Sequence, residues 1–299
     1  MFINQLLKTK RVTLFLYLPI PVLFCTLSVI NFVVIKLMKL DVNTIIKNEI
    51  EQNGTTRFFI DSMIPFLVGL VFLFLWVKFV HKQTLTSLTT SRPKVDWSRI
   101  IFSFTIWSFF TIASTAVLYY INPNGFVLNF KLVPFLELAV LGILLIPIQT
   151  SFEEYLFRGY MMQGIGLATG NKLAPLLITS TLFGLMHIAN PEVDKMGYII
   201  LVYYIGTGLL LGILTLMDEG MELSLGFHAA NNLIGALLIT SDWSAFQTNS
   251  LLKDVSAPSA GFDILMPVFI IYPMLLIIFS KKYNWTNWND KLAGKVNNS

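Results

Sequence analysis

Residues 132–168 read LVPFLELAVLGILLIPIQTSFEEYLFRGYMMQGIGLA, the longest apolar run in the chain. As one straight helix this run would extend about 55 Å at 1.5 Å per residue, nearly twice the hydrocarbon core of a bilayer. It must therefore tilt, kink or include a part at the membrane interface, and Pro147 is the expected kink. The run also contains Glu153, Glu154 and Arg158, although a charge at the centre of a membrane helix costs roughly 2.5–3.5 kcal/mol.

Apolar runs recur along the whole chain. Of the 299 residues, 55% are hydrophobic and 13% are charged, which leaves too little polar surface for a water-soluble globule of this size. The pattern predicts an all-α polytopic membrane protein with about eight transmembrane helices. The expected spans are residues 12–36, 58–80, 100–121, 132–168, 173–189, 197–217, 223–241 and 263–280.

The loops between these spans are too short to hold a separate folded domain. We divide the chain into three N-terminal spans (residues 1–131), a core that contains the charged cluster (132–241), and a last span with the tail that follows it (242–299). The first apolar run is too long for a signal peptide and lacks a small-residue cleavage site, which favours a permanent span. The single cysteine, Cys25, lies in that span, so no Cys-rich metal site is expected.

The Lys and Arg residues indicate the orientation. With the N-terminus in the cytoplasm, 13 of them fall on the cytoplasmic side and 7 outside, and Lys78 lies within a span. This predicts an integral protein of the cytoplasmic (inner or plasma) membrane with both termini in the cytoplasm. There is no basic nucleic-acid patch and no Gly-rich phosphate loop, so we expect the lipid bilayer, and no nucleic acid, as a partner.

The charged cluster predicts two different carboxylates. Glu154 and Arg158 are four residues apart, with the acid N-terminal to the base, which is the favourable order for an ion pair on a helix. Glu153 points about 100° away from Glu154, so we expect it to be free to act on water. The alternative is a ring of interfacial charges at a helix end.

Two of the three histidines lie in late spans. His187 follows Phe183 by one turn, and His228 precedes Asn232 by four residues. Taken singly, each His would be an interhelical hydrogen bond or a helix cap. Because polar groups must find partners away from lipid, we expect the three helices that carry these groups to converge. His81 is expected at a basic membrane boundary and is assigned no role.

The set Glu153, His187, His228 and Asn232 suits hydrolysis by activated water. A carboxylate beside an imidazole can take a proton from water, while a second imidazole and an amide can stabilise the oxyanion. The same two His and one carboxylate could instead bind zinc with an open fourth position, and spacing does not separate the two. We favour the metal-independent version, which requires no cofactor.

Three motifs carry a family resemblance: Glu153-Glu154-x-x-x-Arg158, Phe183-x-x-x-His187 and His228-x-x-x-Asn232. In this order and at these separations they resemble the CAAX protease and bacteriocin-processing family, also called the abortive-infection family. The resemblance covers about residues 132–241. It implies an eight-helix intramembrane endopeptidase with a conical catalytic core, similar to the type II CAAX prenyl endopeptidases, whose eukaryotic members remove the last three residues from prenylated C-termini.

The resemblance also implies roles for the motif residues. Glu153 with His187 would activate water, and His228 with Asn232 would form the oxyanion hole. Glu154 with Arg158 would support the site. The expected topology conflicts with this in one respect, because it places His187 near the far end of its span, and the mechanism requires the groups to lie within about one helix turn in depth.

Other functions remain as alternatives. The family also includes bacteriocin self-immunity proteins and members acting as scaffolds, so a non-catalytic immunity or scaffold protein of the same fold is the main one. A transporter or channel could use the buried charges, although no paired repeat supports it. A lipid-modifying hydrolase is the last alternative.

Overall fold

A computed structural model describes residues 1–8, 14–259 and 261–296. The start of the first expected span, at residues 12 and 13, lies outside the described residues. The helices are α1 (Pro19–Leu37), α2 (Val42–Asn53), α3 (Thr55–Trp76), α4 (Leu85–Thr89), α5 (Trp97–Ile121), α6 (Leu132–Glu154), α7 (Met162–Thr169), α8 (Leu173–Leu185), α9 (Pro191–Met196), α10 (Ile200–Asp218), α11 (Glu222–Leu238), α12 (Phe262–Met266), α13 (Tyr272–Tyr283) and α14 (Trp288–Ala293). Short 3-10 or π-helical segments cover Ile3–Lys8, Leu14–Tyr17, Val77–His81, Pro123–Gly125, Tyr155–Met161 and Pro267–Ile271.

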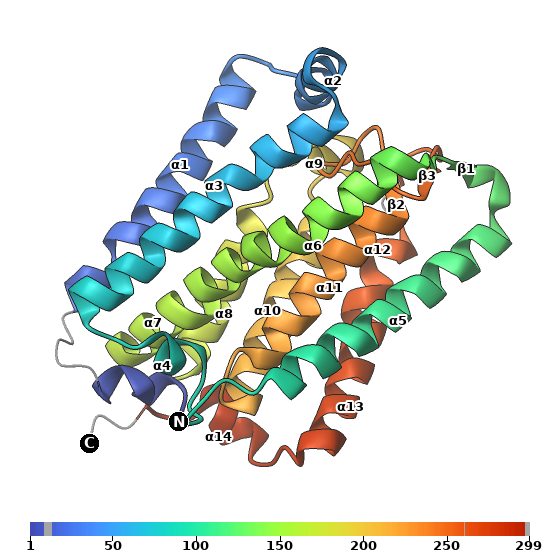
Figure 1. Cartoon of the computed structure of the whole chain (residues 1–299). Coiled ribbons are helices and arrows are strands. Elements are labelled where there is room, and N and C mark those ends of the chain that lie inside the picture. The colour runs from blue at the N-terminus through green and yellow to red at the C-terminus, as the bar shows by residue number, and fades with distance from the viewer. Residues whose placement is uncertain (9–13, 260, 297–299) are drawn as a thin grey trace.

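The long helices run beside one another as a bundle (Figure 1). Within the described residues, six helical stretches are long and apolar enough to cross a membrane: Phe15–Leu37, Thr55–His81, Trp97–Ile121, Leu132–Thr169, Ile200–Asp218 and Ile264–Tyr283. The chain is therefore an all-α polytopic membrane protein.

Two expected spans are shorter than predicted. The segment 173–189 forms α8, which ends at Leu185 after 13 residues, and the segment 223–241 forms α11, which ends at Leu238 before a short strand. Helix α11 lies inside the bundle and packs on α5, α6 and α10. Helix α8 packs on α10 with one face and exposes apolar side chains such as Leu177 and Ile178 on the other. The six stretches of spanning length and these two helices account for the eight expected segments, and the count of eight spans stays a prediction.

The longest run remains helical from Leu132 to Thr169. Helix α6 continues through Pro147, and the helix geometry changes only at Tyr155–Met161, a π-helical stretch directly after Glu153 and Glu154. Such π-helical turns often occur at functional sites, because they rotate the side chains that follow.

Helices α10 and α11 form the centre of the bundle. In the most apolar window of α10, 61% of the residues are buried, against 11% in the first span. Helices α11 and α5 approach closely at Gly226, which has no side chain. A Cβ at this position would stand 2.1 Å from the Ile100 carbonyl oxygen on α5. Small residues of this kind let membrane helices pack at short range.

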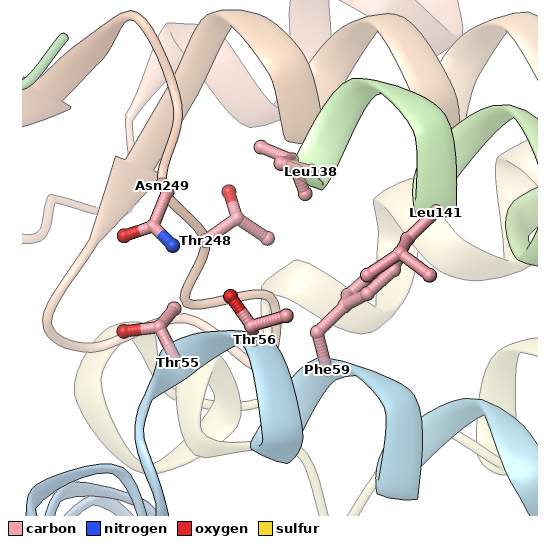
Figure 2. A pocket seen from close by; sticks show the side chains of 7 residues that line it. All are labelled: Thr55, Thr56, Phe59, Leu138, Leu141, Thr248 and Asn249. Atoms are coloured by element: carbon pink, nitrogen blue, oxygen red, sulfur yellow. The ribbon is translucent and has the colours of Figure 1, made fainter. Parts of the chain in front are cut away.

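The two ends of the bundle differ (Figure 1). At one end α2 and α9 lie near a small sheet of β1 (Phe126–Leu128), β3 (Leu252–Asp254) and β2 (Ile239–Ser241), in which β1–β3 is antiparallel and β2–β3 parallel. The N-terminal segment, α4 and α14 lie at the opposite end. A small pocket near the sheet is lined by Thr55, Thr56, Phe59, Leu138, Leu141, Thr248 and Asn249 (Figure 2), none of which is a predicted site residue.

Candidate active site

Glu154 and Arg158 form a fully buried ion pair. The Arg158 Nη1 atom lies 3.1 Å from Glu154 Oε1, and neither side chain is exposed. The second guanidinium nitrogen, Nη2, donates to the Gly208 carbonyl on α10 at 3.1 Å. The expected ion pair is therefore present, and it also ties the end of α6 to α10.

His228 lies between the two carboxylates. Its Nδ1 atom is 2.9 Å from Glu154 Oε1, and its Nε2 atom is 3.4 Å from Glu153 Oε2. The sequence analysis paired Glu153 with His187, but the imidazole beside Glu153 in the structure is His228. Glu153 and Glu154 point in different directions from α6, and each meets a different nitrogen of the ring that α11 presents to them.

His187 lies just beyond the end of α8. Its Nδ1 atom donates to the Phe183 carbonyl oxygen at 2.8 Å, and its ring stacks on Tyr204 of α10 with centroids 4.2 Å apart. No hydrogen bond or ion pair joins His187 to Glu153 among the described residues.

Phe183 connects His187 to the charged cluster. The Phe183 ring centroid is 5.1 Å from that of His187 and 5.7 Å from that of His228, and the Arg158 guanidinium lies 4.3 Å from the same ring. Both imidazoles thus border one aromatic ring. His187 follows the end of α8 at Leu185, as the sequence predicts, and its depth in the membrane relative to Glu153 and His228 stays a prediction.

The two imidazoles share one feature. Each uses Nδ1 for an anchoring contact, His187 to a carbonyl and His228 to a carboxylate. An anchored Nδ1–H fixes the ring orientation and leaves Nε2 for chemistry. The site therefore offers two Nε2 atoms, of which that of His228 faces Glu153.

Asn232 is linked to Glu153 through Gln149. The Asn232 amide donates to Gln149 Oε1 at 3.0 Å, and the Gln149 amide donates to Glu153 Oε1 at 2.8 Å. Gln149 was missed by the sequence analysis, although it lies four residues before Glu153 and so shares its helix face. Tyr204 was also missed, because an aromatic residue in an apolar span carries no distinguishing pattern.

His81 is the last residue of the helical stretch Thr55–His81 and is followed by Lys82. Its side chain is fully buried, and Nε2 is 2.9 Å from the Tyr160 hydroxyl. Its contacts are with Tyr17 and Tyr160 rather than with the charged cluster, which leaves it without a part in the candidate site.

The residues named for a zinc site do not gather around one point. Among the described residues, no group of three or more His, Cys, Asp and Glu side chains is arranged to hold a metal ion. His187 is turned toward the Phe183 carbonyl and Tyr204. The arrangement of Glu153, His187 and His228 therefore does not fit a two-histidine, one-carboxylate zinc site.

Comparison with known proteins identifies the segment that holds this site. Residues 132–234 match the family model "Type II CAAX prenyl endopeptidase Rce1-like". The uncharacterized protein YyaK of Bacillus subtilis (strain 168) is 33% identical over 186 residues, which is 62% of this chain and 62% of that protein. The match thus spans less than two thirds of the relative's length, and no solved structure matches the chain significantly. The two glutamates, the buried arginine, the two histidines and the asparagine all lie within the segment that matches this family model.

Proposed function

We propose that this protein is an intramembrane endopeptidase that uses glutamate-activated water to hydrolyse a peptide bond of a membrane-associated peptide or protein, with lipidated chains among its candidate substrates. The observation that carries the proposal is the buried arrangement around Glu153: one carboxylate oxygen is held by Gln149 and the other lies beside His228. A positioned carboxylate next to an imidazole is the arrangement that general-base catalysis requires.

The proposed reaction needs no covalent intermediate. Glu153, whose carboxylate lies beside Nε2 of His228, takes a proton from water, and the water oxygen forms a bond to the scissile carbonyl carbon. The carbonyl oxygen becomes an oxyanion, which the Asn232 amide and His228 stabilise. The carbon–nitrogen bond then breaks, and the proton held by Glu153 passes to the leaving amine.

The remaining charges support this chemistry. Glu154 accepts a hydrogen bond from Nδ1 of His228 and is itself held by Arg158, so the imidazole ring does not have to reorganise during the reaction. Because the ion pair is fully buried, its interactions act in a medium of low dielectric constant, where they are stronger than in water.

The proposal is tested with the purified protein in detergent and a panel of fluorogenic peptides, lipidated and unlipidated. We expect wild type to cleave at least one peptide, Glu153→Gln to cleave none, and a zinc chelator to leave the wild-type rate unchanged. Loss of the wild-type activity with chelator would contradict the metal-independent mechanism. Equal cleavage by Glu153→Gln would contradict the role of Glu153.

The immunity or scaffold alternative is tested in cells that lack the native gene. If the protein acts as a protease, Glu153→Gln fails to complement the deletion although it reaches the membrane at the wild-type level. Full complementation by Glu153→Gln would show that the cellular role does not need proteolysis.

A further inference from the structure

A chain of hydrogen bonds enters the candidate site from the α5 side of the bundle. The Trp107 indole donates to Asn231 Oδ1 at 3.1 Å, and the Asn231 amide donates to Asn232 Oδ1 at 3.0 Å. From there the chain continues from Asn232 to Gln149 at 3.0 Å and from Gln149 to Glu153 at 2.8 Å. It crosses three helices, beginning on α5, passing through α11 and ending on α6.

The two ends of this chain fix its direction. A Trp indole can only donate a hydrogen bond, and an ionised carboxylate can only accept one. Every amide between them must therefore turn its oxygen toward Trp107 and its nitrogen toward Glu153. Flipping any one of the three amides would place two donors or two acceptors face to face, so the orientation of the Asn232 side chain is set from a residue four hydrogen bonds away from Glu153.

The direction of the chain has two consequences for the site. Glu153 receives an N–H donor, which stabilises its ionised form, the form that accepts a proton from water. The Asn232 side-chain oxygen accepts a hydrogen bond from Asn231, and one of its two amide hydrogens is donated to Gln149. Its second amide hydrogen has no hydrogen-bond partner among the described residues, and an oxyanion needs such a donor.

We propose that Trp107, Asn231 and Gln149 are positioning residues that hold Glu153 and Asn232 in the orientation the reaction needs. This inference rests on the proposed function, because it assigns these residues a role in the same hydrolysis. Burial supports it: Trp107 and Gln149 are both about 95% buried, and the Trp107 ring is itself fixed between Phe110, Phe227 and Tyr272. A rigid anchor at the start of the chain limits the freedom of every amide that follows.

The main test compares two tryptophan variants. Trp107→Phe keeps an aromatic ring and removes the N–H at the start of the chain. Trp76→Phe is the matched control, because the Trp76 indole also donates a hydrogen bond, at 3.2 Å, but to the Leu16 carbonyl outside the chain. We expect Trp107→Phe to lower kcat about 10–100-fold, the range for a displaced catalytic group, with KM nearly unchanged, and Trp76→Phe to alter neither.

A second variant tests whether the residues act as one chain. Asn231→Leu keeps the side-chain size and removes both polar atoms, so it breaks the chain of hydrogen bonds between Trp107 and Asn232. If Trp107 acts only through this chain, the double variant of Trp107→Phe and Asn231→Leu loses no more kcat than Asn231→Leu alone. Losses that multiply in the double variant would overturn the inference, as would equal kcat for Trp107→Phe and Trp76→Phe.

A third measurement needs no substrate and so separates this inference from the proposed function. The protein has six Trp residues. The Trp107 indole signal in a nitrogen-15 NMR spectrum is assigned by its loss in Trp107→Phe. We expect the Trp107 indole N–H to exchange with deuterium slowly in wild type and quickly in Asn231→Ala. If the Trp107 indole N–H of wild type exchanges as fast as that of the exposed Trp97, the proposed hydrogen-bond chain is contradicted. Slow exchange with no peptide cleavage by wild type would leave the chain in place and contradict the proposed function.

Discussion

Arg158 places a guanidinium charge where none of its side chain is exposed. Its partners are the Glu154 carboxylate, the Gly208 carbonyl and the Phe183 ring. Replacing Arg158 by Met would leave Glu154 buried without its cation, which typically costs about 3–5 kcal/mol. We predict a loss of unfolding free energy of this size, measured by thermal or denaturant unfolding in detergent.

The control is Arg57→Met. Arg57 also forms an ion pair at a spacing of four residues, with Asp61, but 65% of its side chain is exposed. Exposed pairs of this kind contribute about 0–1 kcal/mol, so the unfolding midpoint should barely move. Similar shifts of the unfolding midpoint for Arg158→Met and Arg57→Met would show that the buried ion pair contributes no more to stability than the exposed one.

At the scale of single residues, spacing predicted some contacts and not others. The ion pair follows from the separation of Glu154 and Arg158 on one helix, which the sequence displays directly. The partner of Glu153 depends on how α6 and α11 are placed relative to each other, and no spacing along the chain reports that. Gln149 could have been found from its position one turn before Glu153, whereas the link from Trp107 needed three helices in place.

At the scale of elements, the segment between α4 and α5 is tied to the turn between α10 and α11. Arg92 pairs with Asp218 and Glu222, and Arg99 pairs with Asp218 and Asp96. The sequence analysis counted Arg92 and Arg99 only as orientation signals. In the structure they also hold the end of α10 and the start of α11, the helix that carries His228.

We call the ion pairs of Arg92 and Arg99 with Asp218 and Glu222 the clamp, and we predict that Asp218→Asn, which removes one of its carboxylates, destabilises the protein. Two arginines would lose a carboxylate whose side chain is 2% exposed, and an unsatisfied buried group costs about 1–3 kcal/mol. Asp242→Asn is the control, since Asp242 pairs with Lys253 but is 76% exposed. Unfolding midpoints in detergent provide the measurement, and a larger loss at Asp242 than at Asp218 would be evidence against the clamp.

Two glycines of α11 allow a matched test of helix packing. A Cβ on Gly226 would collide with the Ile100 carbonyl, whereas a Cβ on Gly235 would meet nothing within 4 Å. We predict that Gly226→Ala lowers the unfolding free energy by about 1–3 kcal/mol, as overpacking does. It should also lower activity, because His228 lies two residues further along α11.

Gly235→Ala should leave stability unchanged or raise it by up to about 1 kcal/mol, because Ala is the better helix former. Both variants are compared by unfolding in detergent and by rate of peptide cleavage. If Gly226→Ala is as stable and as active as Gly235→Ala, the close approach of α11 to α5 is not required.

Helix boundaries were the least predictable part of the elements. The apolar run at 173–189 continues past the end of α8, so hydropathy alone extends the helix to His187 and beyond. The chain reaches Pro191 soon afterwards, and a residue before proline disfavours helical geometry. The turn from Leu185 to Asn190 is what places His187 beside Phe183 and Tyr204, and it is invisible in the hydropathy pattern.

At the scale of the whole molecule, the composition was enough to predict an integral membrane protein. Which side of the membrane the two termini face stays a prediction. Lys47 on α2 and Lys94 between α4 and α5 are both exposed. Helices α2 and α4 lie at opposite ends of the bundle (Figure 1). In a Cys25→Ser background, a membrane-impermeant maleimide should label Lys47→Cys in intact cells and Lys94→Cys only after permeabilisation. The reverse pattern would place the termini outside the cytoplasm.

The most direct test of the central claim is the rate of peptide-bond cleavage by Glu153→Gln relative to wild type, in proteoliposomes with the best substrate of the panel. Glu51→Gln is the control, because Glu51 is a largely exposed carboxylate on α2. The account predicts a loss of about 10²–10⁴-fold for Glu153→Gln, the usual contribution of a general base, and the wild-type rate for Glu51→Gln. A Glu153→Gln rate within a few-fold of wild type would contradict glutamate-activated hydrolysis at this site.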